Sequence, residues 1–115
     1  MQQSPIFVRT YDFLHWLLPA TAKFPRQHRF ILAEQLQRKA FELQDSLVQA
    51  GLSSRAGTAL NRADCALASL RIYLRLAHDL NLLSHRRYEH AAGMLIEIGN
   101  LLGGWKKSHN AGDGV

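Results

Sequence analysis

Residues 59–80, ALNRADCALASLRIYLRLAHDL, decide the fold, because their apolar side chains recur at alternating intervals of three and four residues. The members of this seam are Leu60, Ala63, Leu67, Leu70, Leu74 and Ala77. Such a spacing lines one face of an α-helix and is typical of helices that pack against other helices. The stretch therefore predicts one long helix with a single buried face.

The N-terminal segment, SPIFVRTYDFLHWLL, predicts another helix. Ser4 is a suitable N-cap and Pro5 a suitable first helical residue. Pro19 is expected to end or kink this helix, because proline cannot donate to the helical hydrogen-bond ladder. The apolar positions expected to face the core are Phe7, Tyr11, Leu14 and Leu18.

Two more helices are predicted, one between Pro25 and Gly51 and one after Ser84, which can cap it. The buried face expected for the first comprises Leu32, Leu36, Ala40, Leu43, Leu47 and Ala50. The corresponding face of the second comprises Tyr88, Ala91, Leu95, Ile98, Leu102 and Trp105. No segment alternates with the period of a strand. Four amphipathic helices with short connections predict an all-α, antiparallel up-down-up-down four-helix bundle.

The chain of 115 residues, 47% of them hydrophobic, has the size and composition of a single domain. We expect the bundle to occupy residues 1–107 and the polar tail, residues 108–115, to be disordered. No apolar run is long enough to span a membrane, and no basic leader precedes an apolar segment, so a cytoplasmic location is expected. Cys65 stands among alanines and is expected to be a small buried side chain.

The balance of charge favours a polyanionic partner. Fourteen Lys and Arg residues oppose nine Asp and Glu residues, which gives a net charge of +5. Most of the cations are arginine, whose planar guanidinium pairs with phosphate and stacks on bases. Charge alone does not select the kind of polyanion.

Arg71 and Arg75 each follow a seam position by one residue, so they flank the buried face of their helix. One interpretation is structural: their aliphatic stems cover apolar surface, and Asp64 or Asp79 neutralises them. The other is functional: together with His78, they form a face that binds phosphate or contacts a partner subunit. The sequence leaves both interpretations open.

Two further basic clusters lie at the starts of predicted helices. KFPRQHRF (residues 23–30) contains Lys23, Arg26, His28 and Arg29, and SHRRYEH (residues 84–90) contains Arg86 and Arg87. Arg38 and Lys39 add positive charge along the second helix. Cations are unfavourable at helix N-termini unless an anion docks on the free backbone N–H groups there. The clusters indicate either anion-binding sites or charges that are simply solvated.

No catalytic arrangement, metal site or cofactor motif is evident. The chain has no phosphate-binding glycine loop and no nucleophile elbow, and the five-residue spacing of His85 and His90 does not suit one helical face. Arg71 and His78 are similar to the arginine–histidine signature of helical HEPN ribonucleases. Those enzymes usually carry a polar residue after the arginine, whereas Ile72 stands here.

Three segments carry a family resemblance: FPRQHRFILAEQL (residues 24–36), ADCALASLRIYLRLA (63–77) and EIGNLLGGWKK (97–107). Together they resemble the accessory variability determinant (Avd) proteins of diversity-generating retroelements. That family lies within the wider four-helix-bundle group named after proteins encoded in 23S rRNA intervening sequences. The similarity covers roughly residues 7–107.

The resemblance implies a homopentameric barrel with a basic surface and no catalytic activity. It also implies binding to nucleic acid and to the retroelement's reverse transcriptase, in support of error-prone copying of a template RNA into cDNA. By motif position, Arg26, His28, Arg71 and Arg75 would face partners or the channel of the barrel. The alternatives are a generic intervening-sequence-type interaction protein and a HEPN-like ribonuclease.

Overall fold

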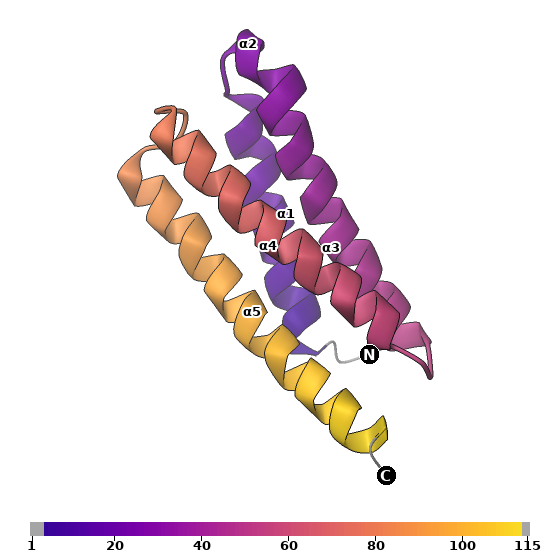
Figure 1. Cartoon of the computed structure of the whole chain (residues 1–115). Coiled ribbons are helices and arrows are strands. Elements are labelled where there is room, and N and C mark those ends of the chain that lie inside the picture. Colours follow the sequence, from indigo (N-terminus) through magenta and orange to yellow (C-terminus); the bar gives the residue numbers. More distant parts are fainter. Residues whose placement is uncertain (1–3, 114–115) are drawn as a thin grey trace.

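The computed structural model describes residues 4–113, and within that range every regular element is a helix (Figure 1). The four long helices are α1 (Pro5–Ala22), α3 (Glu34–Leu52), α4 (Gly57–Asp79) and α5 (His85–Asp113). Two short elements, α2 (Arg26–His28) and the π-helix η1 (Arg29–Ala33), lead into α3. The predicted all-α fold is confirmed.

Successive long helices run in opposite directions along a molecule with principal extents of 51 × 27 × 24 Å (Figure 1). Helix α3 packs against α1 and α4, and α5 packs against the same two helices. The four long helices therefore surround one core in the order α1, α3, α4, α5. This is the up-down-up-down arrangement that the sequence predicts.

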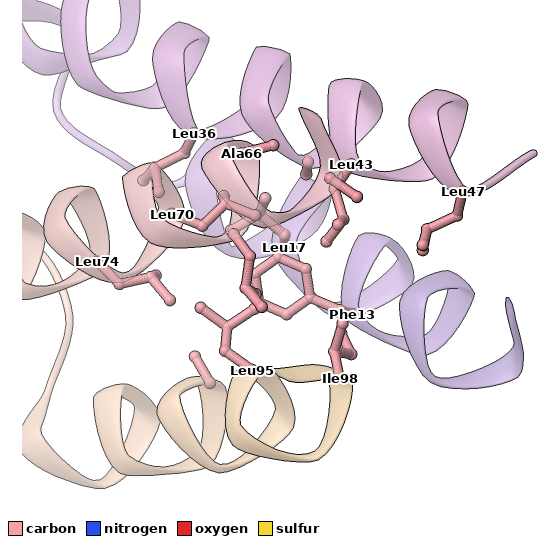
Figure 2. Packing of buried hydrophobic residues seen from close by; sticks show 14 of the residues in the cluster. Phe13, Leu17, Leu36, Leu43, Leu47, Ala66, Leu70, Leu74, Leu95 and Ile98 are labelled. Carbon is pink, nitrogen blue, oxygen red and sulfur yellow. The ribbon is translucent and has the colours of Figure 1, made fainter. Parts of the chain in front are cut away.

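The core is made by the apolar seams of the helices. All six seam residues predicted for α4 are buried, and so are the six predicted for η1 and α3. Figure 2 shows Phe13 and Leu17 of α1 among leucines of α3 and α4 and beside Leu95 and Ile98 of α5. Each fully buried leucine or phenylalanine contributes about 1.5–3 kcal/mol relative to an exposed one, so this layer is the main source of stability.

The face of α1 that packs on the core differs from the predicted one. Tyr11 is 64% exposed and Leu18 is 38% exposed, so these two predicted core positions are wrong, whereas Phe7 and Leu14 pack, partly buried, against the core. The buried residues are Ile6, Thr10, Phe13, Leu17, Ala20 and Thr21. Apolar periodicity misses this face because two of its members are threonines. The Thr10 hydroxyl donates to the carbonyl oxygen of Ile6 at 2.8 Å, which makes its burial inexpensive.

Helix α1 also continues past Pro19 to Ala22, so the prediction that this proline ends the helix is wrong. Its last turn is held by tertiary contacts. The Thr21 hydroxyl donates to the carbonyl oxygen of Leu17 at 2.9 Å and accepts a hydrogen bond from Nε2 of Gln37 in α3, also at 2.9 Å. These contacts offset the hydrogen bond that proline cannot make.

Three other expectations are corrected. Helix α3 runs through Gly51 to Leu52, and α5 continues to Asp113, where a disordered tail was expected from residue 108. The extra turns of α5 lie beside the start of α4, because the imidazole of His109 lies against Gly57. Cys65 is exposed rather than buried, since it lies off the seam of α4. Residues 114 and 115 lie outside the described part.

The turn between α4 and α5 is tightly defined. Asn81 has a positive φ of 62°, a left-handed conformation that asparagine tolerates better than most residues. The N–H of Leu82 donates to the carbonyl oxygen of Ala77, and that of Asn81 to His78, which together form a Schellman motif. Ser84 then caps α5, as predicted, by accepting a hydrogen bond from the N–H of Arg87 at 3.2 Å.

Candidate nucleic-acid interface

The positive charge of the chain is concentrated in one half of the bundle. Residues 23–42 and 71–90 contain nine of the fourteen Lys and Arg residues but only four of the nine Asp and Glu residues. The rest of the chain has five of each, so these two segments carry the whole excess of +5. The fold brings them to the same half of the molecule, because α2, the start of α3, the end of α4 and the start of α5 lie together (Figure 1).

We call this half the basic end. Its extremity carries most of the predicted site residues: Arg26, His28, Arg29, Arg75, His78, Arg86 and Arg87, together with Lys23. Arg38 and Lys39 lie further along α3, and Arg71 lies one turn before Arg75 on α4. Three clusters that are distant in sequence therefore lie in the same half of the fold.

Three of these cations have acidic neighbours. Arg38 pairs with Glu34 at 2.9 Å, and Lys39 pairs with Glu42 at 3.1 Å. Arg75 lies 3.9 Å from the carboxylate of Asp79, with both side chains exposed. Exposed pairs of this kind contribute little, about 0–1 kcal/mol, so an incoming phosphate can compete for these cations.

The other guanidinium groups of the basic end are not paired with an acid within residues 4–111. Arg26, Arg71 and Arg86 form no ion pair there. Arg29 donates Nε to the carbonyl oxygen of Phe24 at 3.0 Å, and Arg87 lies 5.5 Å from the centre of the Trp16 ring. Neither contact neutralises the charge. The basic end therefore presents several cations that no carboxylate of residues 4–111 neutralises.

Arg71 lies in the groove between α4 and α5. It lines a cavity of about 210 Å³ together with Leu74, Tyr88, Ala92, Leu95 and Ile96. Its guanidinium lies over Gly99 of α5, where a side chain would collide with it. Arg71 is exposed and off the buried seam, as predicted, and the neighbouring Asp64 pairs instead with Lys106 at 2.8 Å.

Residues 6–109 of the sequence match a family model described as bAvd-like. The chain belongs to the bAvd-like family. This confirms the resemblance to Avd proteins and supports its classification as an Avd-type accessory protein. No curated protein matches the sequence. None of the helices in residues 4–113 of this bAvd-like protein is long and apolar enough to cross a membrane.

His78, the histidine of the suggested ribonuclease signature, contacts residues other than Arg71. The His78 ring stacks on Tyr88, with 4.6 Å between ring centroids, while Arg71 lies over Gly99. Six residues of helix lie between the two, and the helical rise from one to the other is about 10 Å. The geometry of one protomer therefore brings no arginine–histidine pair together at this place.

Sequence analysis missed two exposed apolar residues beside the cations. Phe30 is 72% exposed and Ile31 is 73% exposed, although both lie in the apolar run RFILA. The following residues, Leu32 and Ala33, are buried. A signal was present in the sequence: four consecutive apolar residues cannot all face the core of a helix. In this bAvd-like protein the π-helix, a feature frequent at functional sites, presents an aromatic ring next to Arg29.

Proposed function

We propose that this bAvd-like protein is a non-catalytic accessory protein of a diversity-generating retroelement. In this proposal its basic end binds template RNA or the cDNA copied from it, and another part of its surface binds the reverse transcriptase. The observation that carries the proposal is the concentration of the whole net charge in one half of the bundle. The cytoplasm is the proposed place of action.

The chemistry of the basic end suits a phosphate backbone. Arg26, Arg71 and Arg86 offer guanidinium forks free of carboxylate partners within residues 4–111. Each guanidinium can donate two parallel hydrogen bonds to the oxygens of one phosphate. Such a contact does not depend on the identity of the base. Affinity is therefore expected to depend strongly on salt and weakly on base sequence.

Phe30 extends the proposal to single strands. An exposed aromatic ring stacks on an unpaired base, whereas the bases of a duplex are already stacked on one another. Arg29 lies next to it in the same π-helix and can hold the adjoining phosphate. The ligand that fits this surface best is therefore a single-stranded segment of RNA or cDNA.

We further propose that the protein assembles as a homopentamer. Exposed apolar residues follow one another along α4 at four-residue spacing: Ile72, Leu76 and Leu80. A second row on α3 comprises Phe41, Val48 and Leu52. Exposed apolar rows on two helices support self-association. Five copies would present about five times the charge of one chain to a polyanion.

Sedimentation equilibrium tests the assembly. We expect a species of five chains over the micromolar range. A substitution of Ile72 by Asp, at a position outside the core, is expected to shift the protein toward smaller species without unfolding it. A monomer throughout the micromolar range would contradict the proposed pentamer.

Co-purification tests the function. A candidate reverse transcriptase is mixed with the protein, with and without template RNA, and the retained fraction is measured. Retention supports the retroelement role. If the protein retains neither the reverse transcriptase nor RNA, the generic intervening-sequence-type interaction protein is the better description. Cleavage of labelled RNA that disappears in a His78→Ala variant would instead establish the HEPN-like alternative.

A further inference from the structure

We propose that the junction of α4 and α5 holds a divalent transition-metal ion, with Zn²⁺ as the best fit, between His78 and His85. His78 lies in the last turn of α4, and His85 is the first residue of α5. Nε2 of His78 lies 3.4 Å from Nδ1 of His85. The inference concerns this pair alone and does not depend on the proposed nucleic-acid binding.

The separation of the two nitrogens is compatible both with a long hydrogen bond between the rings and with a shared metal ion. Hydrogen bonds donated by N–H groups are typically about 2.7–3.2 Å long, so 3.4 Å is long for one. Two imidazole nitrogens that each lie about 2.0–2.1 Å from a tetrahedral Zn²⁺ are about 3.4 Å apart. The pair therefore has the spacing of two ligands of one tetrahedral ion.

The outer nitrogens of both rings face carboxylates. Nδ1 of His78 lies 3.5 Å from Oδ1 of Asp79, and Nε2 of His85 lies 3.1 Å from Oε1 of Glu89. Carboxylates that accept the outer N–H fix the tautomer of metal-binding histidines. In the tautomers that protonate both outer nitrogens, the two inner nitrogens present lone pairs to each other; in the mixed tautomers they share a hydrogen bond. The first arrangement is repulsive unless a cation lies between them.

The His78 ring and the backbone of the junction are held in place before any ion arrives, whereas the His85 ring is exposed. Tyr88 stacks on His78 with an interplanar angle of 26°. The Schellman turn at Asn81 and the cap by Ser84 fix the start of α5 relative to the end of α4. Ordering of the exposed His85 side chain is therefore the main conformational entropy lost when the ion binds.

The site has two protein ligands and remains open to solvent. No group of three or more His, Cys, Asp or Glu side chains suited to a metal occurs in the described part of the chain. The His78 side chain is 31% exposed and that of His85 is 71% exposed, so water can complete the coordination. Imidazole ligands favour Zn²⁺, Cu²⁺ and Ni²⁺ over Mg²⁺ and Ca²⁺. Two ligands imply weaker binding than a structural zinc site with four.

Calorimetric titration of the full chain with ZnCl₂ in metal-free buffer tests the site. We expect about one ion per chain, and we expect His78→Ala and His85→Ala each to weaken binding at least about tenfold. Glu89→Gln is expected to weaken it about tenfold or more while leaving both ligands in place. The matched control is His15→Ala, which removes an exposed histidine of α1 that stacks on Tyr11.

Titration with CoCl₂ provides a second readout, since tetrahedral Co²⁺ absorbs visible light more strongly than the hydrated ion. The absorption should appear with the parent and with His15→Ala but not with His85→Ala. His85 is exposed, so circular dichroism should show its variant to be folded. The proposal is wrong if the parent binds Zn²⁺ no more tightly than His85→Ala. It is equally wrong if Zn²⁺ leaves the NMR signals of both imidazoles unmoved, because the pair then holds only a proton.

Discussion

The guanidinium of Arg71, on α4, occupies the space that a side chain at Gly99, on α5, would fill. A β-carbon built on Gly99 would collide with Nη2 of Arg71 and contact Leu67 at 3.5 Å. The glycine thus leaves room for this cation in the groove between the two helices.

This relationship is testable by comparing two glycines of α5. Nothing lies within 4 Å of a β-carbon at Gly93, so Gly93→Ala should raise the free energy of unfolding by about 1 kcal/mol through helix propensity alone. Gly99→Ala should gain less, because it must displace the Arg71 guanidinium. In an Arg71→Ala background the two gains should become equal. Urea denaturation measures all four differences, and equal gains in the parent would contradict the contact.

Removing the cations beside the seam of α4 should weaken nucleic-acid binding. We expect the double variant Arg71→Ala, Arg75→Ala to stay folded, because both side chains are exposed. Loss of two phosphate contacts should reduce the slope of log affinity against log salt by about 1.4 for a single strand. The control is Arg55→Ala with Arg62→Ala, two exposed arginines outside the basic end. Fluorescence anisotropy with labelled RNA measures both; unchanged affinity of the first variant would remove these residues from the site.

Phe30 provides a test of the preference for single strands. Base stacking contributes about 1–3 kcal/mol per base, so Phe30→Ala should lower the affinity for single-stranded RNA about fivefold or more. Phe30→Tyr should retain it, and binding to duplex RNA should hardly change in either variant. Tyr11→Ala serves as the matched control, since Tyr11 is an exposed aromatic of α1 that lies outside both the basic end and the proposed self-association rows. An equal loss for single strands and duplexes would argue against stacking.

The turn between α4 and α5 should be sensitive to one substitution. Asn81→Val places a β-branched residue at a φ of 62° and should lower the free energy of unfolding by about 1–2 kcal/mol. Asn81→Gly removes the side chain without this strain and should be close to neutral. Thermal or urea unfolding distinguishes them. Similar stabilities for the two variants would show that the turn relaxes.

The seams of α3 and α4 were predictable residue by residue, because leucine and alanine at regular spacing have no other favourable place than the core. The face of α1 was not, since Thr10 and Thr21 are polar by type but bury their hydroxyls by bonding to carbonyl oxygens of their own helix. The continuation of the helix past Pro19 was missed for a related reason. The local cost of the proline is offset by packing that only the tertiary structure reveals.

The basic clusters were visible in the sequence, but their convergence at one end depends on the antiparallel order of the helices. Apolar periodicity with the spacing of an α-helix also cannot register the π-helix Arg29–Ala33, which exposes Phe30. The juxtaposition of His78 and His85 depends on a turn with one left-handed residue. Each of these features depends on how two elements meet in the fold, and the spacing of residues along a single helix does not predict that meeting.

The confinement of the excess charge to one half of a body 51 Å long has a kinetic consequence. Such a body has an electric dipole directed along its length, and the field of a polyanion exerts a torque on it before contact. If the proposed nucleic-acid binding holds, a free protomer therefore arrives at a strand end-on, with its neutral half trailing. Added salt slows association by weakening this orientation as well as the attraction.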